Sequence, residues 1–109
     1  MLDLLTIALE AHNDERNHHR RYEVSVGRDL LGDWVVSVRH GRVGRPLRER
    51  RFGTARVDEA RYVVRDRLHR RLSAPRRIGC RYRMTGFFSA AGFDSGAWAP
   101  AGTLAELLA

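Results

Sequence analysis

The side chains with the clearest chemical potential form a basic group that occupies ten consecutive positions and is punctuated by glycines. The group contains Arg39, His40, Arg42, Arg45 and Arg48. An arginine guanidinium donates two parallel hydrogen bonds to a phosphate and also stacks on flat rings. Glycines such as Gly41 and Gly44 allow a backbone to approach a ligand closely. The pattern predicts a phosphate-binding turn, although five basic residues in a turn are also ordinary for a solvated surface.

The sequence lacks the motifs that would indicate catalysis. The serines lie in no nucleophile-elbow motif, and Gly41–Gly44 lacks the Gly-Lys-Ser/Thr ending and the strand-loop-helix setting of a phosphate loop. Cys80 alternates with arginines, but the apolar Tyr82 and Met84 on its side favour a buried structural thiol over a reactive one. We therefore predict a protein that is not an enzyme; a hidden active site would need carboxylates, histidine or cysteine converging around a pocket.

Metal and cofactor sites are not predicted either. The five histidines show no pairing typical of metal ligands, and His18 and His19 are adjacent, so on a strand they point to opposite faces. One cysteine excludes a zinc site built from several cysteines and an internal disulfide framework. We expect no bound metal and no cofactor.

The charge distribution favours an anionic partner. The 109 residues include 20 arginines, no lysine and 13 acids, which gives a formal net charge of +7. Residues 16–83 contain all 20 arginines and seven acidic residues. In residues 1–15 and 84–109, every charged side chain is acidic. A folded body with this excess attracts polyanions, and nucleic acid is the commonest polyanion in a cell. The alternative is that the arginines are solubilising surface residues.

Other features of the chain restrict its environment. No stretch approaches the ~18–20 consecutive apolar residues that a membrane span needs, so no membrane partner is expected. The N-terminus carries Asp3 where a secretory signal carries basic residues, and Glu10 interrupts its short apolar run. These features predict an intracellular, reducing, cytoplasmic location.

The elements that would position the basic group can be read from the hydrophobic pattern. Alternating apolar and polar residues predict half-buried strands over residues 5–11, 22–26, 34–39 and 48–52, although residues 5–11 also fit a helix face. Loops are expected at residues 12–16 and 27–33, and a glycine-punctuated turn at residues 40–46.

A helix should follow the strands. Ala60, Val64, Leu68 and Leu72 recur every four residues, which predicts an amphipathic helix of four to five turns. Thr54 is the expected N-cap, and Ser73-Ala74-Pro75 should stop the helix. A last strand is predicted over residues 80–84. Together these elements predict an α+β fold: an antiparallel sheet of four to five strands with one helix packed across one face.

The domain should extend over residues 1–84, followed by an extension over residues 85–109 rich in glycine, alanine and aromatic residues. Phe87, Phe88, Phe93 and Trp98 are too many large apolar side chains for a solvated tail. Two interpretations stay open: the extension packs back on the domain, or it forms a self-interface that makes a homodimer.

Several segments together resemble the WGR domain, a small module of some poly(ADP-ribose) polymerases and of bacterial stand-alone proteins. The resemblance runs from about Leu5 to Arg83 and rests on segments in the family's order: Asn13–Asn17, Arg21-Tyr22, Gly32-Asp33-Trp34, His40–Gly44, Glu59-Ala60, Arg76–Gly79 and Tyr82. His40 stands where the family has its signature tryptophan, whereas Gly41, Arg42 and Gly44 are retained.

The resemblance implies an antiparallel sheet crossed by one helix, and DNA binding without a reaction inside the module. It also implies that residues 40 and 42 meet DNA near a strand end, with less stacking area from an imidazole than from an indole. We therefore predict a non-enzymatic nucleic-acid-binding domain that prefers DNA to RNA; the alternative is an interaction or dimerisation module with an acidic protein partner. The predicted binding residues are Arg39, His40, Gly41, Arg42, Arg45, Arg48, Arg61 and Arg65.

Overall fold

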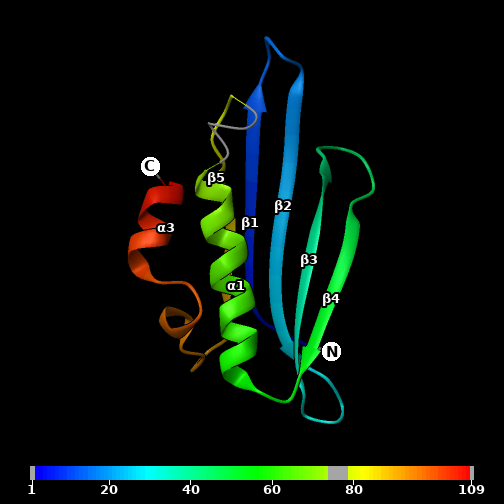
Figure 1. The fold of residues 1–109 in the computed structure, drawn as a ribbon, viewed down its shortest axis with the longest axis vertical. Helices are drawn as coiled ribbons and strands as arrows, with labels where there is room; N and C mark the ends of the chain where they lie inside the picture. The colour runs from blue at the N-terminus through cyan, green and yellow to red at the C-terminus, as the bar shows by residue number, and fades with distance from the viewer. Residues whose placement is uncertain (1, 74–78, 109) are drawn as a thin grey trace.

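The computed structural model, which describes residues 2–73 and 79–108, has a five-stranded sheet with two helices on one face (Figure 1). All neighbouring strands are antiparallel, in the order β4-β3-β2-β1-β5. The predicted α+β architecture is confirmed. The elements are β1 (Asp3–Asn13), β2 (His18–Arg28), β3 (Trp34–Arg42), β4 (Arg48–Thr54), α1 (Val57–Leu72), β5 (Arg83–Ser89), the 3₁₀ helix η1 (Ser95–Ala97) and α3 (Ala101–Leu108).

The first hairpin is longer than the sequence pattern indicated. β1 is a strand throughout, which settles the choice between strand and helix, and it continues through His12 and Asn13. The predicted loop over residues 12–16 is therefore wrong at its first two positions, because cross-strand pairing extends the ladder to Asn13 opposite His18. The turn is closed by the backbone N–H of Asn17, which donates to the carbonyl of Asp14 at 3.1 Å.

The second hairpin also departs from the prediction at its turn. His40, Gly41 and Arg42 belong to the end of β3 instead of the turn, because β3 stays paired with β2 as far as Arg42 opposite Arg20. Gly41 has a φ of +156°, and a Cβ there would approach Leu47 Cδ2 to 3.3 Å. A glycine is favoured because L residues rarely adopt this φ and because a Cβ would require the Leu47 side chain to move by a few tenths of an ångström.

The core lies between the sheet and α1. Alternate residues of β1, β2 and β3 face α1. The helix packs an apolar stripe, with four-residue spacing, against them. These side chains are almost fully buried: Leu5, Ile7, Leu9, Val24, Val26, Val36, Val38, Ala60, Val64 and Leu68. The stripe predicted for the helix is confirmed for its first three members, while Leu72 in the last turn is only partly buried.

The start of α1 differs from the prediction. Arg56 occupies the N-cap position without a side-chain cap, so the assignment of Thr54 as N-cap is wrong. Thr54 closes a turn two residues earlier: its hydroxyl accepts from the backbone N–H of Arg56 at 3.1 Å and donates to Glu59 at 2.6 Å. Ala74 and Pro75, predicted to stop the helix, lie outside the described residues. No helix in the described ranges is long and apolar enough to cross a membrane.

The last strand begins later than predicted. β5 runs from Arg83 to Ser89 along β1, so a strand over residues 80–84 is wrong in position, and only residues 83 and 84 fall inside the strand. The chain then returns over the face that carries α1 (Figure 1) and buries Trp98, Ala99 and Leu107 in the core. Trp98 lies 5.0 Å from Trp34 and 5.7 Å from Phe93, measured between ring centroids.

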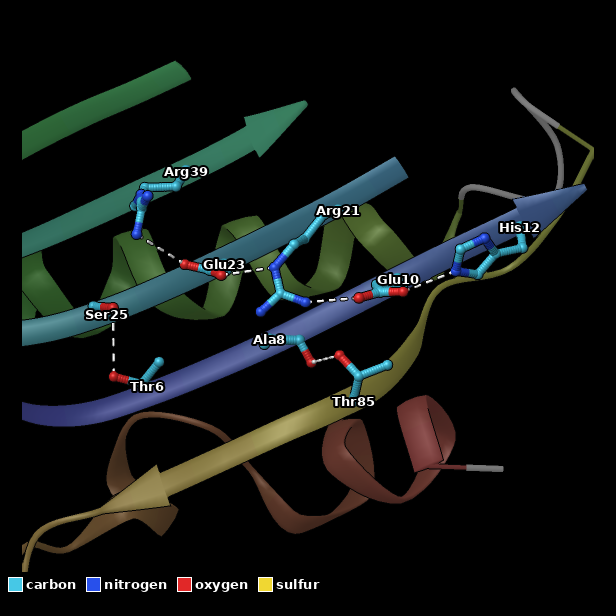
Figure 2. Close-up of polar contacts among 9 residues, drawn as sticks. All are labelled: Thr6, Ala8, Glu10, His12, Arg21, Glu23, Ser25, Arg39 and Thr85. Carbon is cyan, nitrogen blue, oxygen red and sulfur yellow. Dashed lines mark hydrogen bonds and ion pairs between the residues drawn. The ribbon is translucent and has the colours of Figure 1, made fainter. Parts of the chain in front are cut away.

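The sheet face opposite α1 carries a row of alternating charges across three strands (Figure 2). Arg39 on β3 contacts Glu23 at 3.4 Å, Glu23 contacts Arg21 at 2.7 Å, and Arg21 contacts Glu10 on β1 at 2.7 Å. Glu10 in turn accepts from His12 Nε2 at 2.8 Å. The hydrogen bond from His12 and the guanidinium of Arg21 hold the pKa of Glu10 below its ordinary value of 4.5.

Replacing Trp98 with alanine should lower the free energy of unfolding by about 3–5 kcal/mol, because the indole is 1 % exposed and its loss leaves a cavity. Urea denaturation of the full chain measures the change. Phe88→Ala is the control, since Phe88 is 53 % exposed and its truncation should cost less than about 1 kcal/mol. Equal losses in the two variants would contradict a structural role for the C-terminal segment.

Replacing Glu10 with glutamine should reduce the acid sensitivity of the fold. A carboxylate whose pKa is lowered by folding contributes stability above its ordinary pKa, and that stability is lost as the pH falls through the folded-state pKa. Wild type should therefore be more stable than Glu10→Gln at about pH 7, and the difference should shrink by about pH 3. Urea titrations at both values test this, and a difference that stays constant with pH would refute it.

Candidate nucleic-acid interface

Strand alternation sorts the predicted binding residues onto two faces of the sheet. His40 pairs with Arg48 across β3 and β4 and shares the α1 face with the buried Val36 and Val38. Arg39, its neighbour, points to the opposite face, where it contacts Glu23. The basic group from Arg39 to Arg48 is therefore not one surface, and only its members on the α1 face lie beside the helix.

A groove lies where α1 leaves the outer strands uncovered. It has a volume of about 320 Å³, and α1, β2, β3 and β4 all contribute to its walls. The residues that line it are Tyr22, Val38, His40, Arg50, Phe52, Arg67, Arg70 and Arg71. Four of these are arginines, and none of the described lining residues is a carboxylate. Asp66 on α1 lies just outside the lining, 3.4 Å from Arg67 and 3.1 Å from Arg70. The groove is therefore an electropositive site on a molecule whose opposite sheet face carries paired charges.

Aromatic rings lie beneath the guanidinium groups of Arg50, Arg67 and Arg71 in the groove. The guanidinium of Arg71 lies 4.4 Å from the ring centroid of Tyr22, and that of Arg67 lies 5.3 Å from the ring of Phe52. Arg50 approaches the Phe52 ring to 5.9 Å. A guanidinium attracted to a ring face still has N–H groups at its edge for hydrogen bonding. The rings thus act as platforms that orient cations toward the groove.

Tyr22 is the polar group at the base of this groove. Its ring is 3 % exposed, and its hydroxyl has no hydrogen-bond partner among the described residues. Burial raises the pKa of the hydroxyl above its ordinary value of 10.0, while the positive charges of Arg71 and Arg67 oppose that shift. The hydroxyl is therefore neutral, and it is buried beside the groove arginines without a hydrogen-bond partner among the described residues.

Arg42 has a structural partner at the tip of the first hairpin. Its guanidinium donates to the backbone carbonyl of Asn17 at 3.0 Å and to the side-chain oxygen of Asn17 at 2.9 Å. Asn17 has a φ of +53°, so Arg42 stabilises a turn residue in the left-handed region. A guanidinium has five N–H donors, and two of those of Arg42 hold the β1–β2 turn beside the end of β3.

Arg45 lies in the β3–β4 turn, where its backbone N–H donates to the carbonyl of Arg42 at 3.1 Å and its side chain is exposed. Gly44 before it has a φ of +81°, which the turn requires. Arg45 and Arg48 therefore extend the basic surface from the groove toward the hairpin tip.

The helix arginines chosen from the sequence lie on the other side of α1. Arg61 approaches the ring of Trp98 to 5.6 Å, so it faces the C-terminal segment, and Arg65 follows one turn later on the same side. The groove instead receives Arg67, Arg70 and Arg71, which the sequence reasoning missed together with Tyr22, Arg50 and Phe52. The four-residue spacing of Arg67 and Arg71 at the edge of the apolar stripe was the available signal. It could not show which side of the helix adjoins β4.

Comparison with known proteins is consistent with this geometry. The family model of the WGR domain matches residues 5–71, a range that includes every residue lining the groove. Searches of curated proteins and of solved structures gave no match. WGR domains are non-catalytic nucleic-acid-binding modules. The match covers more than half of the chain and confirms the resemblance found in the sequence: this protein belongs to the WGR domain family.

Proposed function

We propose that this chain binds DNA without catalysing a reaction, and that the groove between α1 and β4 receives the phosphate backbone. The observation that carries the proposal is the lining of the groove by four arginines. Arg67 and Arg70 also contact the carboxylate of Asp66, whereas Arg50 and Arg71 lie against aromatic rings. Phosphates attract such a site at long range, and planar guanidinium groups then bind them with paired hydrogen bonds. Sugar-phosphate contacts of this kind give affinity that is largely independent of sequence.

His40 would make the contact next to the phosphates. The side chain of His40 is exposed at the groove. It lies opposite Arg48 on β4, and Arg50 is the next β4 residue on the same face. Its flat ring can pack on a sugar or a base while the arginines hold the backbone. Arg45 and Arg48 would extend the track along the β3–β4 turn. This interface does not include Arg39, which contacts Glu23 on the opposite face. It also does not include Arg61 and Arg65, which lie on the side of α1 that faces the C-terminal segment.

Binding to labelled oligonucleotides tests the function directly. Fluorescence anisotropy with duplex, nicked and single-stranded DNA, and with RNA of the same sequence, should give the tightest binding to DNA. The logarithm of the affinity should fall with the logarithm of salt, by about 0.9 per neutralised phosphate. Absence of binding at low salt would overturn the proposal, and tighter binding to RNA would overturn the choice of DNA.

Arg50→Gln should weaken DNA binding about tenfold, because hydrogen bonds to charged groups are worth about 1.5–3 kcal/mol. It should also reduce the salt slope by about 0.9. Arg51→Gln is the matched control: it removes the same charge from the next residue, whose side chain faces away from the groove and lies 3.7 Å from Glu49. Anisotropy titrations compare the two. Equal losses would mean that net charge, and not the groove, determines binding.

His40→Trp should tighten binding by roughly threefold to tenfold, since stacking of a base on an aromatic ring contributes about 1–3 kcal/mol and an indole offers more area than an imidazole. His69→Trp, on an exposed position of α1 outside the groove lining, serves as the control. The same titrations report the effect. A gain of equal size at residue 69, or none at residue 40, would exclude a stacking role for the His40 position.

A further inference from the structure

Two histidines face each other across β1 and β2, on the sheet face opposite α1. His12 and His19 are directly paired in the strand register, near the end of the hairpin. Their Nδ1 atoms lie 2.8 Å apart, and their ring planes are inclined at 49°. They share this face with Glu10 and Arg21, which lie two positions along the ladder.

The outer nitrogen of each ring faces a carboxylate. His12 Nε2 lies 2.8 Å from Glu10 Oε1, and His19 Nε2 lies 3.5 Å from Asp14 Oδ1. A neutral imidazole has one N–H and one lone pair, and a carboxylate accepts a hydrogen bond but does not donate one. The carboxylates therefore favour the proton on Nε2 of both rings. With both protons on Nε2, the two Nδ1 lone pairs face a common space and need a cation between them; if one ring instead carries its proton on Nδ1, the contact is a hydrogen bond.

We propose that His12 and His19 bind a late first-row divalent transition-metal ion, such as Ni²⁺, Cu²⁺ or Zn²⁺, through both Nδ1 atoms. Imidazole nitrogens coordinate such ions at ~2.0–2.1 Å, so two ligands at a right angle would be roughly 2.9 Å apart. The observed 2.8 Å is close to that separation. A carboxylate that accepts from the outer N–H orients a metal-binding histidine and increases its basicity, and Glu10 is placed to do this for His12. Asp14 lies farther from the outer nitrogen of His19, at 3.5 Å.

The surroundings define what kind of ion fits. No group of three or more histidine, cysteine or acidic side chains suited to a metal occurs in the described ranges, so the protein supplies two ligands and water completes the coordination. Two neutral nitrogens do not suit Mg²⁺ or Ca²⁺, which prefer oxygen ligands. Arg21 is adjacent, but its charge is shared between Glu10 and Glu23. A bound ion would link β1 to β2 close to the β1–β2 turn. Arg42, at the end of β3, contacts Asn17 in the same turn.

Titration of the full chain with Ni²⁺ tests the proposal, because Ni²⁺ binds imidazole without oxidising Cys80. Calorimetry should detect one equivalent bound to wild type, with at least tenfold weaker binding for His12→Ala and for His19→Ala. His69→Ala should bind as wild type, and Mg²⁺ should not bind. Unchanged Ni²⁺ binding in both cross-strand variants, or an equal loss in the His69 variant, would overturn the site.

A second measurement on unmodified protein keeps the test independent of any folding defect in the variants. Diamagnetic Zn²⁺ should shift the Nδ1 resonances of His12 and His19 in nitrogen-15 spectra of the imidazoles, while both Nε2 atoms stay protonated. Shifts confined to other histidines would overturn the proposal. So would spectra that stay the same with Zn²⁺ present, since a proton shared between the two Nδ1 atoms would then account for their contact.

Discussion

The packing of α1 on one face of the sheet is the constraint on which the rest of the molecule depends. Alternate residues of β1, β2 and β3 must enter the core with Ala60, Val64 and Leu68. A slip of one residue in any of these strands would expose its whole apolar set, so the register is strongly determined. Once it is determined, every polar residue between the buried ones has an assigned face. The positions of His40 beside the groove and of Arg39 on the far side follow from this packing alone.

The same constraint explains what the sequence could and could not predict. The apolar stripe of α1, the approximate strands and the α+β class follow from local periodicity, and these are confirmed. The groove needs the order of strands in the sheet and the side of the helix that adjoins β4, and neither has a local signature. The sequence therefore gives no reason to prefer Arg67 to Arg61, since both flank the stripe. The His12–His19 pair was missed for a related reason: it depends on the exact length of the hairpin turn.

The arginines of the two faces of the sheet have different partners. On the face opposite α1, glutamates alternate with arginines, so that each charge near Arg21 and Arg39 has a counter-charge within 4 Å. On the α1 face, aromatic rings take the place of carboxylates beside Arg50 and Arg71. A carboxylate partner largely neutralises the charge of an arginine, whereas an aromatic ring carries no net charge and leaves it available. Arg67 and Arg70 also contact Asp66, so the contrast between the two faces rests on Arg50 and Arg71.

Aromatic support also bears on the histidine at the position of the family's tryptophan. An indole at residue 40 would supply a broad surface for a base, and an imidazole supplies less. The groove nevertheless contains Tyr22 and Phe52, each covered by a guanidinium plane. Flat guanidinium groups stack as rings do and bind phosphate at the same time. In this chain, affinity would rest more on the cations held over these rings and less on the side chain at residue 40, which shifts recognition toward the backbone of the nucleic acid and away from its bases.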